Sequence, residues 1–308
     1  MRAAAPVLTA LALAGCAHSG ASPAVRYVDA HSHILAEMHA EDEIAMMRRA
    51  GLAGVVIMSP DPEALARIVA VDPGFVTPFV SIARTRDMKG IRLDDDSAAR
   101  FAALHAAGAI CGFGEIPTRL EPNPEPSDAA AIANAFRTRI YAEADRLRVP
   151  VNVHVSLENP EVVAAVERAV AAYPGMKLIL AHSGWSAEAG LIGRLLAAHP
   201  NLYADLSVRL GPAEGWPAPG TSGPALPNRI SILGADGALL PEWRALIEHF
   251  PDRFLFGLDI TSTGSGRAHH IDELMAASRH ALGQLPRGVE HAVSHGNIER
   301  LLKGCRRD

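Results

Sequence analysis

Two histidines stand one residue apart in the stretch RYVDAHSHI, residues 26–34, directly after an apolar run. Side chains two positions apart on a β-strand share a face, with about 6.6 Å of rise between them. The imidazoles of His31 and His33 can therefore converge on one ion, with each nitrogen roughly 2.0–2.1 Å from a metal such as zinc. Because H-x-H also arises by chance, the pair alone does not decide between a metal site and a polar loop.

Other apolar segments end in residue types that bind metals. His154 follows the run in VNVHVS, and His182 follows the run in LILAHS. Glu115 stands at the end of GFGEI, and Asp259 at the end of FGLDI. Because each segment should be buried, the polar residue at its end needs a partner such as a metal ion. The predicted metal ligands are His31, His33, Glu115, His154, His182 and Asp259.

The elements that must position these ligands alternate along the chain. Predicted strands cover residues 26–31, 53–59, 75–82, 109–116, 150–156, 177–183, 201–207 and 253–260. Helical patterns between them cover residues 41–51, 62–71, 128–147, 159–174, 189–200 and 241–251. Eight such units predict an α/β fold, a (β/α)₈ TIM barrel forming a single domain over residues 26–308. A doubly wound sheet is the competitor, but no dinucleotide-binding glycine pattern follows the first strand. In a barrel all eight carboxyl ends open on one face, where the six ligands would meet.

The N-terminus has the character of a targeting segment. Residues 1–15 combine Arg2 with an apolar run over residues 7–13, and the sequence LAGC resembles the bacterial lipobox. We expect residues 1–15 to be a signal peptide, Cys16 to be lipidated, and residues 16–25 to form a tether. The protein would then be an exported lipoprotein anchored to a membrane and facing the periplasm or cell exterior. The alternative is an ordinary secretory signal that contains a cysteine. Cys111 and Cys305 do not predict a disulfide framework.

Composition narrows the choice of partners. The 308 residues carry a formal net charge of −5, which gives no basic surface for nucleic acid. Aromatic residues make up 5% of the chain, too few to suggest a base-stacking surface. We therefore expect a small-molecule substrate and no nucleic-acid partner.

Taken together, the motifs resemble the amidohydrolase superfamily of metal-dependent hydrolases, in its amidohydrolase-related branch. The matching segments span the mature chain and are VDAHSHI, VNVHVS, LILAHSGW, PDRFLFGLDI and HGNIERLL. The resemblance implies that His31, His33 and Asp259 hold one divalent ion. It implies that His154 and His182 hold a second ion where one is present. It is also compatible with a homodimer.

Glu115 departs from the commonest pattern of that superfamily. Many members bridge two metals with a carboxylated lysine at the end of the fourth strand, whereas others, including metal-dependent DNases with a similar GEI sequence, use glutamate. Glu115 would then bridge two ions, or it would accept a hydrogen bond from a ligating histidine. The number of ions, one or two, is left open. Zinc suits imidazole and carboxylate ligands, and manganese, iron or cobalt also fit.

The chemistry implied is hydrolysis. A divalent ion lowers the pKa of a water that it binds to ~7, and Asp259 would take the proton and pass it to the leaving group. The expected target is an amide, lactone or ester bond. The alternatives are a metal-dependent decarboxylase, a phosphoesterase or DNase-like hydrolase, and a barrel without activity. Candidates for substrate binding, from their positions just beyond the ligand strands, are Arg84, Arg119, Trp185 and Arg209.

Overall fold

The computed structural model describes residues 25–120, 126–211, 230–261 and 268–305. Eight parallel strands follow one another in chain order around a single sheet. They are β1 (Val28–His33), β2 (Gly54–Ser59), β3 (Val76–Val80), β4 (Gly112–Pro117), β5 (Pro150–His154), β6 (Lys177–Leu180), β7 (Leu202–Asp205) and β8 (Phe254–Leu255). The predicted (β/α)₈ barrel is confirmed, and each strand lies within or overlaps its predicted range.

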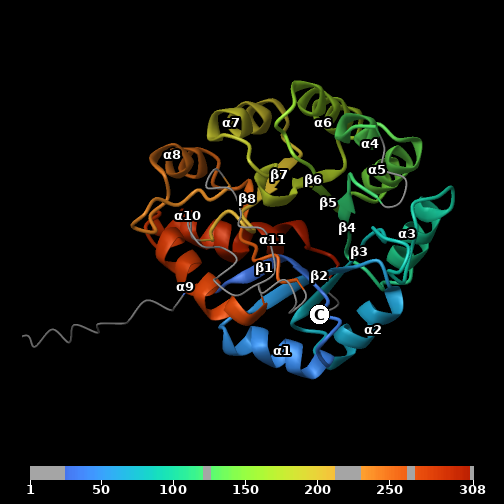
Figure 1. Ribbon diagram of the computed structural model, residues 1–308, viewed down its shortest axis with the longest axis horizontal. Coiled ribbons are helices and arrows are strands. Elements are labelled where there is room, and N and C mark those ends of the chain that lie inside the picture. The colour runs from blue at the N-terminus through green and yellow to red at the C-terminus, as the bar shows by residue number, and fades with distance from the viewer. Residues whose placement is uncertain (1–24, 121–125, 212–229, 262–267, 306–308) are drawn as a thin grey trace, which may run out of the picture.

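Helices surround the strands as an outer ring (Figure 1). In the first half of the chain they are α1 (Ala40–Arg49), α2 (Pro62–Val71), α3 (Ser97–Ala106), α4 (Asp128–Ile132), α5 (Ala135–Leu147) and α6 (Pro160–Ala172). The second half adds η1 (Ala181–Ser183), α7 (Ala189–Ala198), α8 (Pro241–His249), η3 (Ala268–His270), α9 (Ile271–Leu282), α10 (Arg287–His291), η4 (Ala292–Gly296) and α11 (Asn297–Leu301). The helix predicted over residues 128–147 is divided because Asn134 caps a new helix, accepting a hydrogen bond from the Phe136 amide.

Buried apolar side chains form two clusters. The larger one lies between the outer helices and the sheet, and it includes Phe101 of α3 and Phe113 of β4. The smaller one includes Met58 of β2, Phe79 of β3 and Ile298 of α11. Each fully buried side chain of this size contributes about 1.5–3 kcal/mol, so both clusters hold the strand ends in fixed positions.

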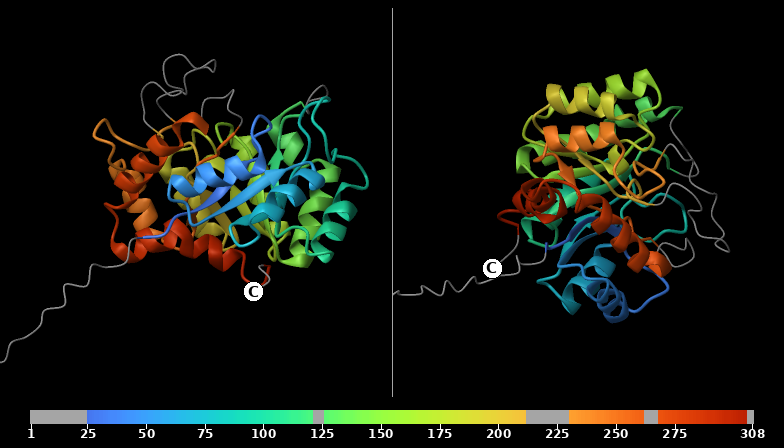
Figure 2. Two further views of the ribbon diagram at one scale, coloured as in Figure 1. Left: turned by 90° about the horizontal axis from the view of Figure 1, so that it is seen from below. Right: turned by 90° about the vertical axis from the view of Figure 1, so that its left-hand side faces the viewer.

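The last elements of the chain close the amino-terminal end of the barrel, where the C-terminus lies in Figure 2 (left). The Asn297 side-chain amide donates hydrogen bonds to the carbonyls of Pro251 and Phe254 at the start of β8. Cys305, beyond α11, forms a disulfide with Cys111, and their Cα atoms are 5.4 Å apart. The sequence did not predict a disulfide between these cysteines, and that interpretation is wrong, because α11 brings the end of the chain against the start of β4.

The predicted signal peptide, the lipidation site Cys16 and almost all of the tether lie outside the described residues. Within the part of the chain that is described, no helix has the length and apolar character needed to cross a bilayer.

Candidate metal centre

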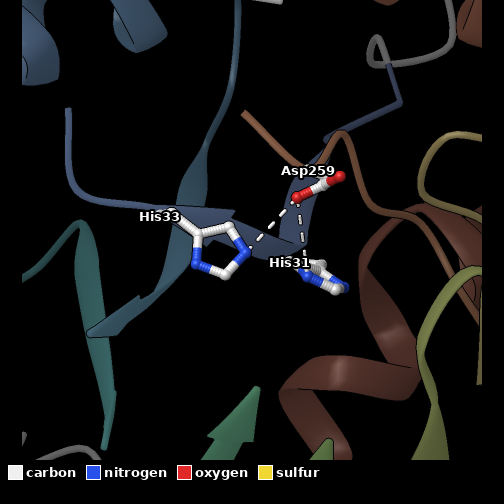
Figure 3. A group of neighbouring side chains, drawn as sticks. All are labelled: His31, His33 and Asp259. Atoms are coloured by element: carbon white, nitrogen blue, oxygen red, sulfur yellow. Dashed lines mark ion pairs between the residues drawn. The ribbon is translucent and has the colours of Figure 1, made fainter. Parts of the chain in front are cut away.

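The six side chains predicted as metal ligands lie together, on or just beyond strands β1, β4, β5, β6 and β8. In Figure 3 the rings of His31 and His33 both approach the carboxylate of Asp259. Oδ1 of Asp259 is 3.3 Å from Nε2 of His33 and 3.7 Å from Nε2 of His31. Among the described residues, three groups have ligand atoms within 4.8 Å of one another: His31, His33 and Asp259; His31, His182 and Asp205; and Glu115, His154 and His182.

His31 is the most firmly held of these ligands. Its side chain is 0% exposed, and its Nδ1 lies 3.0 Å from Oδ2 of Asp205, which is also 0% exposed. Nε2 is buried and has no hydrogen-bond partner. Burial by itself lowers the pKa of His31, but nearby carboxylates, above all that of Asp205, raise it to about 10. The same carboxylates that favour a proton on Nε2 would favour a metal cation there.

His182 is oriented from behind by Asp205, the last residue of β7, and by Ser207, two residues beyond it. Its Nδ1 lies 2.8 Å from Oγ of Ser207, and its backbone amide donates to Oδ1 of Asp205 at 2.9 Å. The Ser207 hydroxyl donates in turn to Asp205. In this network His182 donates from Nδ1 and is left with a bare lone pair on Nε2, the form that binds a metal. Burial lowers the pKa of His182, which keeps the ring neutral.

Glu115 occupies the middle of the cluster, because all four imidazoles lie within 4 Å of its carboxylate. Oε1 is 2.6 Å from Nδ1 of His154, 3.5 Å from Nε2 of His182 and 3.8 Å from Nε2 of His31. Oε2 is 3.7 Å from Nε2 of His33. Burial raises the pKa of Glu115, but the histidines, first among them His154, lower it well below its usual range. Glu115 is therefore a carboxylate placed between two groups of ligands.

The rim of the barrel near this cluster contains unusual backbone conformations. His182, Ser183, Trp185 and Asp259 all have positive φ angles, between 50° and 65°. For residues other than glycine, such left-handed conformations cost about 1–3 kcal/mol and persist only where surrounding contacts impose them. They are typical of functional sites, and here they coincide with two predicted metal ligands and one predicted pocket residue.

The donor set fits a divalent ion. Imidazole nitrogens and carboxylate oxygens are ligands for zinc and its neighbours in the first transition series. The unpartnered Nε2 of His31 is a buried donor atom of the kind that a cation would satisfy.

A cavity of about 340 Å³ opens beside the cluster, and His154 forms part of its wall. Three of the four predicted substrate residues, Arg84, Arg119 and Trp185, also line it. Arg119 is paired with Asp128 at 3.3 Å, whereas the exposed side chain of Arg84 has no ion-pair partner among the described residues. The remaining lining residues are Thr118, Asp128, Ser156 and Glu158.

Arg209, the fourth predicted substrate residue, is placed differently. Its side chain is 1% exposed, and its guanidinium donates to the backbone carbonyls of Trp185 and Ala187. The guanidinium also lies over the ring of Trp243, 4.5 Å from its centre. Burial lowers the pKa of Arg209 to about 9. Arg209 therefore holds the segment that carries Trp185, and a contact with substrate stays a prediction.

Comparison with known proteins agrees with this arrangement. A family model described as amidohydrolase matches residues 20–304. The chain belongs to the amidohydrolase family. As a member it is an enzyme of the metal-dependent hydrolase type, with a divalent metal as the cofactor typical of the family.

Two solved structures illustrate how far the amidohydrolase fold is shared. An amidohydrolase from Burkholderia multivorans with bound zinc is 16% identical, with a TM-score of 0.57 over 90% of this chain and 99% of that one. A Staphylococcus aureus protein described as an amidohydrolase is 13% identical, with a TM-score of 0.58 and the same shares of the two chains. At these identities the likeness concerns the fold alone. No curated protein matches the sequence.

Three polar residues near the amidohydrolase site were not singled out as site residues from the sequence. Asp205 and Ser207 lie at the end of β7 and orient His31 and His182. Ser156 lies two residues beyond His154 and lines the cavity, and its buried hydroxyl has no hydrogen-bond partner. Asp205 could have been found by the signal that identified Asp259, an acidic residue at the end of an apolar strand. Ser156 follows from the two-residue repeat of β5.

Proposed function

We propose that this metal-dependent hydrolase cleaves an amide, lactone or ester bond of a small substrate. The observation that carries the proposal is the convergence of four imidazoles on the Glu115 carboxylate, together with the unpartnered Nε2 of His31. A buried imidazole nitrogen without a hydrogen-bond partner is uncommon in a folded protein, and a bound cation would satisfy it.

Two groups of ligands follow from the distances. His31, His33 and Asp259 would hold one divalent ion, and His154 and His182 would hold a second. Glu115, within 4 Å of all four histidines, would bridge the two ions. Zinc is the ion we favour, since these donors suit it and since a similar fold from Burkholderia multivorans binds zinc. The bound metal supplies a Lewis acid that acidifies water and polarises the oxygen of the substrate.

Asp259 is the proposed proton carrier. Its side chain is 14% exposed, so that its carboxylate reaches the open side of the cluster, whereas that of Asp205 is wholly buried. Asp259 would accept a proton from the attacking water and return it to the leaving group.

The cavity beside His154 would bind the substrate. Its volume of about 340 Å³ suits a small molecule. Arg84 would bind an anionic group of the substrate, Trp185 would pack against its apolar part, and the Ser156 hydroxyl would form a hydrogen bond with it. Arg119, held by Asp128, and Arg209, held by backbone carbonyls, would act at the edge of the pocket. An Arg84→Ala variant that bound a carboxylate-bearing substrate as tightly as the parent would exclude the proposed contact.

Elemental analysis tests the ligand assignment. We expect two ions per chain in the parent protein, fewer in a His154→Ala variant, and an unchanged content in a His249→Ala control, since His249 is exposed on α8. A His154→Ala protein with the full metal content of the parent would show that the assignment is wrong. Analysis of the reaction products then distinguishes hydrolysis from decarboxylation.

We also propose that the protein works outside the cytoplasm, anchored through lipidated Cys16. The lipobox-like sequence supports this location, and so does the Cys111–Cys305 disulfide, because such bonds persist in oxidising compartments. A Cys16→Ala variant should leave the membrane fraction, and its retention there would contradict the proposal.

A further inference from the structure

The barrel closes between β1 and β8 at the place where the predicted ligands His31, His33 and Asp259 meet. β8 pairs with β7 only through Phe254 and Leu255, and beyond them the chain continues beside β1 with one isolated bridge, between Ser32 and Ile260. Backbone hydrogen bonds across this seam in the described part of the chain run from the amides of Ala30, His33 and Asp259 to the carbonyls of Phe256, Ile260 and His31. The seam is therefore joined by few main-chain contacts in the described residues, although three predicted metal ligands lie on it.

Two buried side chains of β1 add contacts across the seam. One carboxylate oxygen of Asp29 accepts hydrogen bonds from the backbone amides of His31, at 2.9 Å, and Leu258, at 3.0 Å. The other oxygen accepts from the Ser32 hydroxyl at 2.6 Å. Oγ of Ser32 in turn accepts from the Ile260 amide at 3.0 Å. Both side chains are 0% exposed, so neither is available to substrate.

The positions of these contacts matter because they bracket the ligands. On β1 the two side chains alternate with the two histidines, and beyond β8 the two amides that they bind belong to the residues on either side of Asp259. Asp259 itself has a φ of 53°, a conformation that requires its neighbours to be fixed. Gly257 permits the close approach, because a Cβ atom there would lie 3.2 Å from Cβ of His31 and 3.0 Å from Cβ of Ser207.

We propose that Asp29 and Ser32 are positioning residues that fix the Asp259 carboxylate relative to the imidazoles of His31 and His33. The proposal rests on the proposed function, since it assumes that these three side chains bind one ion. Neither residue touches the ion or the substrate. They act by holding the backbone of residues 258–260 at one register and one distance from β1, so that the three ligands are already arranged before the ion binds.

Ser32→Ala is the variant that tests the proposal, with Ser278→Ala as its matched control. Ser278 is a serine of α9 with 1% exposure, far along the chain from the predicted ligands. For each protein we would measure the affinity for Zn²⁺ by competition with a chelator, the visible absorption spectrum of the Co²⁺-loaded form, and the melting temperature of the metal-free form. We expect Ser32→Ala to weaken Zn²⁺ binding about tenfold or more and to change the Co²⁺ spectrum. Ser278→Ala should leave both metal readouts unchanged.

Each outcome has one meaning. A Ser32→Ala protein with the Zn²⁺ affinity and Co²⁺ spectrum of the parent would overturn the proposal, whatever its melting temperature. If Ser32→Ala does not fold, Asp29→Asn takes its place, because the amide nitrogen cannot accept the hydrogen bond from the Ser32 hydroxyl, while the remaining oxygen preserves the fold by accepting from Leu258. An unchanged Co²⁺ spectrum in Asp29→Asn would overturn the proposal. A parent protein that binds no divalent ion would overturn the proposed function as well, which separates the two failures.

Discussion

The candidate metal centre contains two kinds of histidine. His31 and His182 have side chains that are 0% and 3% exposed, and each is held from behind by a residue of the β7 end, Asp205 or Ser207. His33 and His154 are 26% and 27% exposed. Among the described residues, the His154 ring is hydrogen-bonded only to Glu115, within the cluster, and it also lines the cavity.

The difference separates two tasks within one site. The buried pair is fixed by groups that neither substrate nor solvent reaches, so its geometry is set by the folded protein. The exposed pair lies where substrate and water arrive, and its geometry depends on what is bound. The buried pair should therefore matter for stability and affinity alike, and the exposed pair mainly for affinity and turnover.

The difference between the buried and the exposed histidines is tested most strongly by removing one member of each pair. His31→Ala removes the cationic neighbour of the buried Asp205 carboxylate, which keeps hydrogen bonds from Asn152 and Ser207. The substitution should lower the free energy of unfolding of the metal-free protein by about 3 kcal/mol. His33→Ala, at a partly exposed position, should lower the free energy of unfolding by less than about 1 kcal/mol. Urea denaturation measures both values. Equal losses would show that burial does not distinguish the two histidines.

The pH dependence of stability examines the same buried pair without a mutation. In the folded protein the pKa of His31 is raised from 6.5 to about 10. The stabilisation is therefore fully present below about pH 6.5 and is lost as the pH rises towards 10. Denaturation of the metal-free protein across this range should show stability falling with pH. A flat profile would mean that the imidazolium of His31 does not gain from its carboxylate neighbours.

Of these three tests, the Asp205→Asn substitution should have the smallest effect. The amide keeps the shape of the side chain, but it removes the charge that favours a cation on His31. We expect the affinity for Zn²⁺ to fall about 10–100-fold, as for other residues that orient a metal-binding histidine. Asp236→Asn, at an exposed turn, is the matched control and should leave the affinity unchanged. Loss of all bound metal in Asp205→Asn would instead indicate that Asp205 is itself a ligand.

The fold was predictable because its signal is local and repeated. Each strand is a short apolar run, and six of the eight are followed by a predicted helical pattern, as at residues 54–59 and 62–71. The divided helix over residues 128–147 was missed because Asn134 reads equally well as a tolerated polar residue inside one helix. The short helices near the C-terminus were also missed, since their apolar residues face the end of the barrel rather than one outer face.

The site was predictable as far as residue type marks it. His31, Glu115 and Asp259 stand at strand ends, where burial makes a polar residue informative. The roles of Asp205 and Ser207 depend on how close the end of β7 lies to the imidazoles of His31 and His182, and the sequence alone does not specify these distances. The burial of Arg209 and the pairing of Cys111 with Cys305 are likewise long-range facts, the latter joining residues 194 positions apart.

That last bond has a consequence for the integrity of the molecule. It makes the chain from residue 111 to residue 305 a covalent loop that contains β4 to β8, and so four of the six proposed ligands. A protease that cuts once anywhere inside the loop leaves the two fragments attached to each other. Only reduction of the disulfide would then release one fragment from the other, whereas a single cut in a barrel without this bond would leave two pieces with no covalent link.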